Sequence, residues 1–340
     1  MRKMIIPTLS WSQHLRSVRC IAPGLLVVLT VSAAAEFVSV TYGGPVMLIA
    51  LLLGMSLNFL SQSPECVAGI QFASKTALRI GVALLGLRIA ADDVMALGWD
   101  ALIVVSLAVI LTIFTGIGLS RIIGRGSRFG VLIGGATAIC GASAALAISA
   151  ALPNGPGRER ETSFVVVAVT TLSTMAMVIY PALLKALDFT DQDIGLLLGA
   201  TIHDVAQVVG AGYSVSEQAG DAATIIKLFR VSLLMPTIVF VTIFFGDRRP
   251  QTKRQLLPLP LFVVGFGVLA IANSLALVPP VVSMPLQELS RSLLVLAVSA
   301  IGISTSMQDI LKVGFQPVFV AFGSTVMLLV LAIIGMCLLV

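Results

Sequence analysis

Long apolar runs dominate this chain and limit what it can fold into. About eleven of them follow one another, each close to the length that a helix needs to cross the hydrocarbon core of a bilayer. Hydrophobic residues make up 58% of the 340 residues and charged residues only 11%, which is more apolar surface than a water-soluble domain can bury. A β-barrel would show short segments of alternating polarity instead. The sequence therefore predicts an all-α, polytopic membrane protein.

Hydropathy and polar punctuation set the expected span limits, within a few residues. We expect spans at 20–37, 43–60, 74–91, 99–120, 129–152, 163–185, 193–214, 222–245, 257–276, 286–305 and 315–340. Residues 1–19 form a basic leader on the cytoplasmic side. Residues 20–340 are expected to form a single transmembrane transporter domain.

The distribution of charge predicts the orientation, because basic residues concentrate in cytoplasmic connections. With about eleven spans and a cytoplasmic leader, the basic connections at 121–128 and 248–254 fall inside. The acidic connections at 92–100 and 217–221 fall outside, as does the neutral connection at 158–161. We therefore expect a bacterial inner-membrane protein with a cytoplasmic N-terminus and a periplasmic C-terminus.

Three features of the sequence could also be explained in another way. The basic leader, the first apolar run and "SAAAEF" also fit a cleaved signal peptide. The net charge of +5 would suggest nucleic acid in a soluble protein, but here topology explains it, and no nucleic-acid partner is expected. The four cysteines show no metal-ligand spacing and no disulfide framework, so neither a metal nor a cofactor is predicted.

Two segments of the chain resemble each other without a gap: "KTALRIGVALLGLRIAADDVMALGWD" from Lys75 and "RSLLVLAVSAIGISTSMQDILKVGFQ" from Arg291. The matched residues are Leu78 and Leu294, Val82 and Val298, Gly86 and Gly302, Asp93 and Asp309, and Gly98 and Gly314. An odd number of spans separates the copies, so they would lie in opposite orientations. The pattern predicts an inverted-topology repeat with copies around 43–120 and 257–340, as in secondary transporters, although the fifth run then has no partner after the eleventh.

The fifth run, "LIGGATAICGASAALAISAALP", contains glycines on both sides of polar residues. Glycine lowers the energetic cost of interrupting a helix, and a second half-helix would present free N–H groups and a positive dipole end. We expect Thr137, Cys140, Gly141 and Ser143 to contribute to an anion site. The alternative is a small-residue face for helix packing.

The seventh run, "LLLGATIHDVAQVVGAGYSVS", is the second run that we expect to be interrupted, and it places three polar residues inside an apolar segment. His203 and Gln207 are four residues apart and share a helical face. An ionised Asp204 at a helix centre costs roughly 2.5–3.5 kcal/mol, so it needs a partner, a proton or water. His203 and Gln207 are predicted to bind substrate, and His203 and Asp204 to carry a coupling ion. A structural hydrogen-bond network is the alternative.

Two basic residues lie in the eighth run, "ATIIKLFRVSLLMP". Lys227 and Arg230 share a helical face, so they could compensate charge by pairing with Asp204 or attracting an anion. At a membrane interface they would instead extend their charged ends towards water. Both readings stay open from the sequence.

Three motifs together carry a family resemblance: "GGATAICGASAALA", "GATIHDVAQVVGAG" and "ATIIKLFRVSLLMP". They resemble the YeiH-like family of bacterial inner-membrane proteins, over nearly the whole chain from Pro45. The family's assigned role is sulfate export. Its fold is similar to that of the sodium/proton antiporter and bile-acid symporter superfamily, which implies broken core helices.

The expected function is secondary, ion-coupled transport of a small anion, with sulfate or a related sulfur oxyanion as the candidate. The expected partners are this anion and the lipid bilayer, and a homodimer is one open assembly state. Two other classes were considered. An anion channel would share the pore chemistry. A membrane-embedded enzyme using His203 and Asp204 lacks an evident nucleophile, so no catalytic residue and no enzymatic activity are predicted.

Overall fold

A computed structural model describes residues 11–42, 45–89, 98–153, 157–245, 261–305 and 315–339, and every regular element in these ranges is helical. The repeat residues Asp93, Asp309 and Gly314 lie outside the described residues. Six helical stretches in the described ranges are long and apolar enough to cross a membrane. They are Cys20–Tyr42, Gly98–Ile122, Arg160–Ala186, Glu217–Phe245, Pro280–Ser304 and Val318–Leu338. The all-helical membrane fold is confirmed.

The chain divides into two compact units. The first contains residues up to Arg79 and Val295–Thr305, and the second contains Ile80–Leu294 and the residues from Ser306 onwards. Helices α4 (Leu78–Leu85) and α15 (Pro280–Ser304) belong partly to each unit. The expected single transporter domain over 20–340 stays a prediction.

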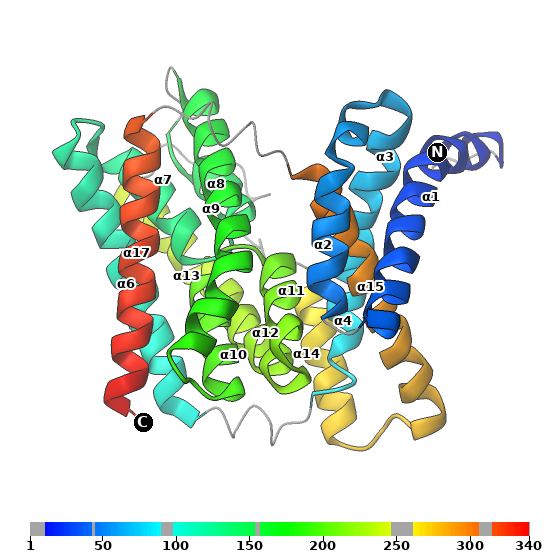
Figure 1. Ribbon diagram of the computed structural model, residues 1–340. Coiled ribbons are helices and arrows are strands. Elements are labelled where there is room, and N and C mark those ends of the chain that lie inside the picture. Colours follow the sequence, from blue (N-terminus) through cyan, green and yellow to red (C-terminus); the bar gives the residue numbers. More distant parts are fainter. Residues whose placement is uncertain are drawn as a thin grey trace, which may run out of the picture. The chain divides into compact units, whose positions relative to one another are not determined.

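The first unit is built from close helix contacts at small residues. It contains α1 (Trp11–Tyr42), α2 (Val46–Ser56), η1 (Asn58–Gln62), α3 (Pro64–Phe72), the π-helical turn η2 (Ala73–Ala77) and the end of α15 (Figure 1). Gly24 of α1 faces Cys66 and Gly69 of α3 so closely that a side chain at residue 24 would collide with the backbone. Gly54 of α2 packs in the same way against Ser299 and Gly302. Such contacts are common between membrane helices.

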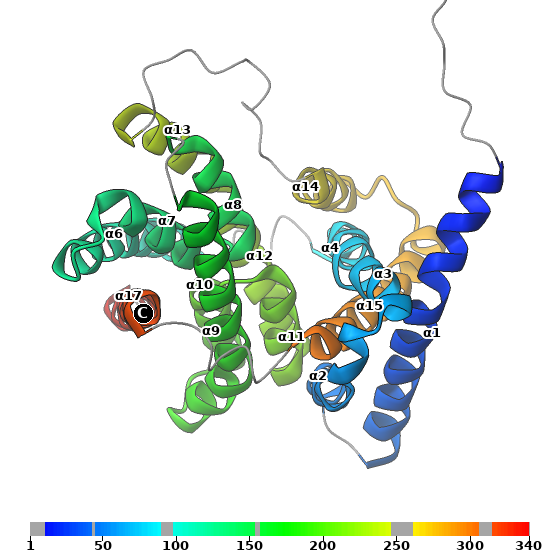
Figure 2. The same cartoon turned by 90° about the horizontal axis from the view of Figure 1, so that it is seen from above.

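The second unit holds most of the described helices. In chain order these are α6 (Gly98–Ile122), α7 (Gly126–Ala138), α8 (Ala142–Ala151), α9 (Arg158–Ala186), α10 (Asp191–Thr201), α11 (Val205–Val215), α12 (Glu217–Ser232), α13 (Leu234–Phe245), α14 (Leu261–Ser274) and α17 (Phe315–Leu339). Helices α6, α7 and α17 form one group (Figure 2). Gly323 of α17 faces Leu119 of α6, and Gly335 faces Val104, so these two helices run antiparallel.

The fifth predicted span is a helical hairpin, which we call the first hairpin. Its arms α7 and α8 have 13 and 10 residues, about 20 and 15 Å at 1.5 Å per residue, too short to cross a bilayer core of about 30 Å. Gly135 on α7 lies against Ile148 on α8, so the arms pack side by side. Both ends lie beside the start of α9, where Arg125 is 3.9 Å from Glu161 and Ser149 is 2.6 Å from Thr162.

The seventh predicted span is the second hairpin, with arms α10 and α11 of 11 residues each. Gly195 on α10 and Gly212 on α11 both lie against Ala219, close to the start of α12. Gly199 packs one turn further on, against Ala223. The arms therefore run in opposite directions along α12, and α10, α11 and α12 lie together in Figure 1.

The two interruptions expected from the sequence are present, but their consequence differs from the expectation. Each segment turns back on itself instead of continuing across. Neither run forms a single crossing helix, so the expected count of eleven spans is not confirmed. The periodic pattern did not reveal this, because an apolar run of about 22 residues fits one span and two short arms equally well.

Candidate functional site at the hairpin tips

The turns of the two hairpins meet inside the second unit. We call residues 139–141 the first tip and residues 202–204 the second tip. Gly141 has φ +63° and ψ −124°, a conformation that residues with side chains rarely adopt, and this allows the sharp turn into α8. A Cβ at residue 141 would lie 3.6 Å from the Cβ of His203, so the tips are in contact.

Lys227 on α12 connects the two tips and is fully buried. Its Nζ donates hydrogen bonds to the carbonyl oxygens of Ile139 at 2.6 Å and Ile202 at 2.9 Å, and also to that of His203. A neutral amine has only two N–H groups, so three accepting carbonyls indicate the charged ammonium. These carbonyls are the unpaired groups that every helix leaves at its C-terminal end.

Arg230, one turn further along α12, is also fully buried and acts on the same helix ends. Its Nε donates to the Ala138 carbonyl at 3.0 Å, and its Nη1 donates to Gly199 and Ile202 at 2.9 and 3.0 Å. Its Nη2 donates to Thr137 and Ala138 at 3.2 and 2.6 Å. A guanidinium has five N–H groups, and all five are used.

The two cations therefore compensate charge in a way the sequence did not indicate. They donate to the carbonyl groups at the C-terminal ends of α7 and α10, where a nearby cation is stabilising. Neither forms an ion pair with Asp204 in the part of the chain that the structure describes. With every N–H group engaged, neither is free to bind an anion directly. Because both are buried, extension of their charged ends to an interface does not apply.

Asp204 begins the second arm of its hairpin. Its Oδ1 accepts a hydrogen bond of 2.9 Å from the backbone N–H of Ala206, so it is the N-cap of α11. The N–H groups of His203 and Asp204 both donate to the Ser173 hydroxyl on α9, at 3.2 and 3.0 Å. Asp204 is only half-buried, in contrast to its neighbours.

His203 is fully buried, and its surroundings define its tautomer. Its Nε2 lies 3.0 Å from the hydroxyl of Thr325 on α17. That hydroxyl already donates its only proton to the Ala321 carbonyl at 2.8 Å, so it accepts from Nε2–H. Nδ1 then carries the lone pair of the neutral ring. Among the described residues Nδ1 has no hydrogen-bond partner.

Two other predicted site residues carry unpaired polar atoms. The hydroxyl of Thr137, in the last turn of α7, is buried and has no partner in the described ranges. Gln207 donates through Nε2 to the Thr174 hydroxyl at 2.7 Å, while its Oε1 is unpartnered there. Buried polar atoms are usually hydrogen-bonded, so unpaired ones next to a helix interruption suggest a ligand or water.

Cys140 and Ser143 lie on either side of Gly141. Cys140 is buried within the first tip, whereas the side chain of Ser143 is exposed. At the N-cap position of α8, Gly141 offers no side-chain hydrogen bond to the first N–H groups of that helix. The positive end of α8 thus begins at the contact between the tips, next to an exposed hydroxyl.

Sequence reasoning missed three hydroxyl residues that hold the second hairpin in place. Ser173, Thr174 and Thr325 bind Asp204, Gln207 and His203 from α9 and α17. The only available signal was the hydroxyl-rich "TTLST" within the sixth run, and this is not specific.

The charges at the tips do not cancel. The negative ends of α7 and α10 are balanced by the positive ends of α8 and α11. Of the ionisable side chains, Lys227 and Arg230 are cationic and Asp204 is anionic, so with neutral His203 one positive charge remains. Because Lys227 and Arg230 are fully buried, this net positive charge favours an anion at the tips.

Comparison with known proteins places the chain in a family. Residues 23–321 match the model of the family described as Conserved hypothetical protein 698. The chain belongs to this family. The match extends from α1 into α17 and includes both hairpins, and it agrees with the YeiH-like resemblance of the three motifs.

Several relatives are similar over nearly their full length. The UPF0324 membrane protein CT0845 of Chlorobaculum tepidum is 48% identical over 92% of this chain and 88% of its own. The UPF0324 membrane protein TauZ of Paracoccus denitrificans is 48% identical over 92% of this chain and 94% of its own. The UPF0324 membrane protein RB0971 of Rhizobium meliloti is 44% identical over 92% of each chain. No solved structure matches this chain.

Proposed function

We propose that this protein is a secondary transporter that binds a small oxyanion at the contact between the two hairpin tips. The observation that carries the proposal is the excess positive charge there, beside the unpaired polar atoms of Thr137, His203 and Gln207. The Thr137 hydroxyl, the first N–H groups of α8 and the Ser143 hydroxyl would donate to the oxyanion.

The arrangement of the hairpins supports alternating access. The start and the end of the first hairpin, opposite its tip, lie at one end of the unit. This end carries Arg121, Arg125, Arg128, Arg158 and Arg160. The second opens towards the end with Asp188, Asp191, Asp193, Glu217 and Asp221. By the positive-inside rule, the first faces the cytoplasm and the second the periplasm. Each tip then separates the site from one side of the membrane, as in transporters with inverted repeats.

This topology keeps the predicted orientation of the termini. Removing two spans leaves an odd number of crossings, so an N-terminus in the cytoplasm still implies a C-terminus outside. Independently, α6 ends at the arginine-rich end and α17 runs antiparallel to it, so α17 ends at the acidic end. The connection at 158–161, expected outside, moves to the cytoplasmic side, which suits its arginines.

The hairpins also account for the incomplete repeat. The antiparallel helices α6 and α17 occupy matching places in the two proposed copies, and the first hairpin follows α6. The second hairpin has the same "GAT" in the last turn of its first arm, which makes it the candidate counterpart in the second copy. We infer that the second copy is circularly permuted, with its hairpin placed earlier in the sequence.

His203 supplies a mechanism for coupling. In the neutral ring its Nδ1 is an acceptor and repels an oxyanion, whereas a protonated ring presents an Nδ1–H donor. Lys227 and Arg230 disfavour a third positive charge unless an anion arrives with it. Proton and anion therefore bind together, and the site then carries two positive charges, which suits a divalent oxyanion such as sulfate. In the empty site, the Asp204 carboxylate offsets one of the two positive charges of Lys227 and Arg230. A second net positive charge therefore arises only when His203 is protonated.

A calorimetric titration of purified protein tests the proposal. Sulfate, sulfite and methanesulfonate are the probes, and sodium gluconate and choline chloride serve as controls for the cation and for salt. We expect binding of a small sulfur oxyanion that strengthens as pH falls, and a His203→Gln variant in which this pH dependence is lost. His14, the other histidine in the sequence, provides the matched control His14→Gln. Binding of sodium or choline without any oxyanion binding would refute the proposal.

A further inference from the structure

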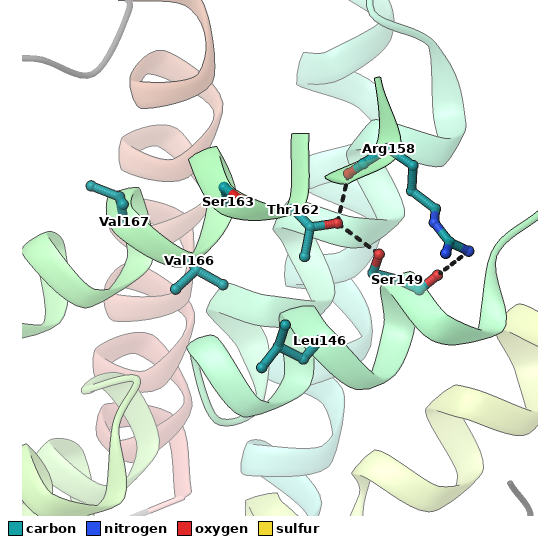
Figure 3. A pocket seen from close by; sticks show the side chains of 7 residues that line it. All are labelled: Leu146, Ser149, Arg158, Thr162, Ser163, Val166 and Val167. Carbon is teal, nitrogen blue, oxygen red and sulfur yellow. Dashed lines mark hydrogen bonds between the residues drawn. The ribbon is translucent and has the colours of Figure 1, made fainter. Parts of the chain in front are cut away.

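An open cavity of about 450 Å³ lies between α8 and α9, near the ends of these helices that face the arginine-rich side of the unit (Figure 3). Its wall is amphipathic. Leu146, Val166 and Val167 form the apolar part, and Leu146 and Val167 are 60% and 38% exposed. Ser149, Thr162 and Arg158 form the polar part on the other side of the view.

The polar part is already organised. The hydroxyls of Ser149 and Thr162 are 2.6 Å apart, and Thr162 also donates to the Arg158 carbonyl at 2.8 Å. Arg158 uses Nη1 to bind the carbonyls of Ser149 and Leu152, at 3.3 and 3.2 Å. Its Nε and Nη2 make no hydrogen bond to any residue in the described ranges. A guanidinium held in place, with three N–H groups that have no partner among the described residues, is suited to a phosphate group.

The surroundings favour a lipid as the source of that phosphate. The cavity is open at its apolar side, on helices whose composition requires a bilayer, so an acyl chain can lie along Leu146 and Val167. At the same end, Arg121 and Arg160 add positive charge, whereas Arg125 lies 3.9 Å from Glu161. Basic pockets between membrane helices on the cytoplasmic side are suited to anionic head groups.

We infer that this cavity binds an anionic phospholipid, with its phosphate on the Nε and Nη2 groups of Arg158 and its acyl chain along Leu146 and Val167. The site is separate from the hairpin tips. Because α8 is the returning arm of the first hairpin, a lipid here would hold that arm against α9.

Native mass spectrometry of the purified full chain, released from detergent, tests this with phosphatidylglycerol, phosphatidylcholine and inorganic phosphate as probes. Arg158→Gln should weaken phosphatidylglycerol binding at least about tenfold, because a charge-assisted pair is lost. Arg160→Gln removes the same charge two residues away, from a side chain that stacks on Phe164 and does not line the cavity, and should bind normally.

Val166→Trp fills the cavity without changing charge, and it should also abolish phosphatidylglycerol binding even if Arg158→Gln does not fold. Equal losses in the Arg158 and Arg160 variants would show diffuse attraction to the basic end and overturn the inference. Equal binding of phosphatidylcholine, or of inorganic phosphate in the Val166→Trp variant, would show that the site does not select an anionic lipid.

Discussion

Lys227 of α12 donates a hydrogen bond of 2.6 Å to the carbonyl oxygen of Ile139, the first residue of the first tip. The same ammonium binds the second tip, so a single buried charge holds two hairpins that enter from opposite ends of the unit. Lys227 therefore has a structural role: it holds the tips together, whereas other residues would contact a substrate.

Replacement of Lys227 by methionine should destabilise the protein strongly. The substitution keeps an apolar stem of similar length but leaves the buried carbonyls of Ile139 and His203 without a donor, at about 1–3 kcal/mol each, while the Ile202 carbonyl keeps its bond from Arg230. The expected loss in unfolding free energy is at least about 2 kcal/mol, seen as an earlier thermal transition in detergent. Lys185→Met, at an exposed position near the end of α9, is the control and should unfold like the wild type. Matching transitions in the two variants would show that Lys227 does not hold the tips.

The hairpins can be distinguished from spans by labelling single cysteines from one side of the membrane. Gln192 and Gln218 lie in the first turns of α10 and α12, and their side chains are 3.4 Å apart. In a background without the four native cysteines, Gln192→Cys and Gln218→Cys should both react with an impermeant maleimide added outside cells. Ser127→Cys, at the start of the first hairpin, should react only after the membrane is opened. Labelling of Gln218→Cys but not Gln192→Cys from outside would restore a crossing seventh span.

Thr137→Val should separate binding from folding. The hydroxyl of Thr137 is buried and unpaired in the described ranges, so its removal should leave the thermal transition unchanged or raise it. Oxyanion affinity should fall at least about tenfold, because a donor to a charged group is lost. Thr201→Val is the control: this residue occupies the equivalent turn of α10, and its hydroxyl is bonded to the Leu197 carbonyl at 2.6 Å. A similar affinity in both variants and the wild type would remove Thr137 from the site.

Asp204→Asn should abolish proton-coupled transport without unfolding the protein. Asparagine caps helices as well as aspartate, so the bond to the Ala206 N–H can remain. The variant adds one positive charge to the tips, which lets an anion bind without a proton and removes the pH dependence of affinity. Asp191→Asn makes the same charge change at an exposed position and should behave as wild type. Normal coupled transport by Asp204→Asn would show that Asp204 serves only as the N-cap of α11.

The sequence predicted the helical membrane fold and the two interruptions because both follow from local chemistry. A run of apolar residues requires a bilayer, and "ICGAS" and "IHDVA" place turn and cap residues where a helix would otherwise continue. Gly141 does lie at the expected interruption, whereas Asp204, expected at the centre of a helix, is the N-cap that begins α11. The sequence did not predict that each hairpin returns to the end of the unit from which it starts, because this depends on tertiary contacts such as those of Gly195 and Gly212 with Ala219.

The roles of the buried cations show the same limit. From the sequence, Lys227 and Arg230 could be assigned to an interface, to Asp204 or to an anion. Their real partners are backbone carbonyls of Thr137, Ala138, Ile139, Gly199, Ile202 and His203. Backbone acceptors have no signature in a sequence, since every residue offers the same backbone carbonyl whatever its side chain is. Only the position of the helix ends makes these carbonyls available.

Flux of labelled oxyanion into proteoliposomes under an imposed pH gradient tests the central claim most directly. If the tips bind proton and anion together, labelled sulfate, sulfite or methanesulfonate should enter vesicles that are acidic outside and alkaline inside. A protonophore should reduce this uptake, and His203→Gln should abolish its dependence on the gradient. Steady flux of the anion that is insensitive to the gradient, in wild type and His203→Gln alike, would contradict coupled transport and identify an anion channel instead.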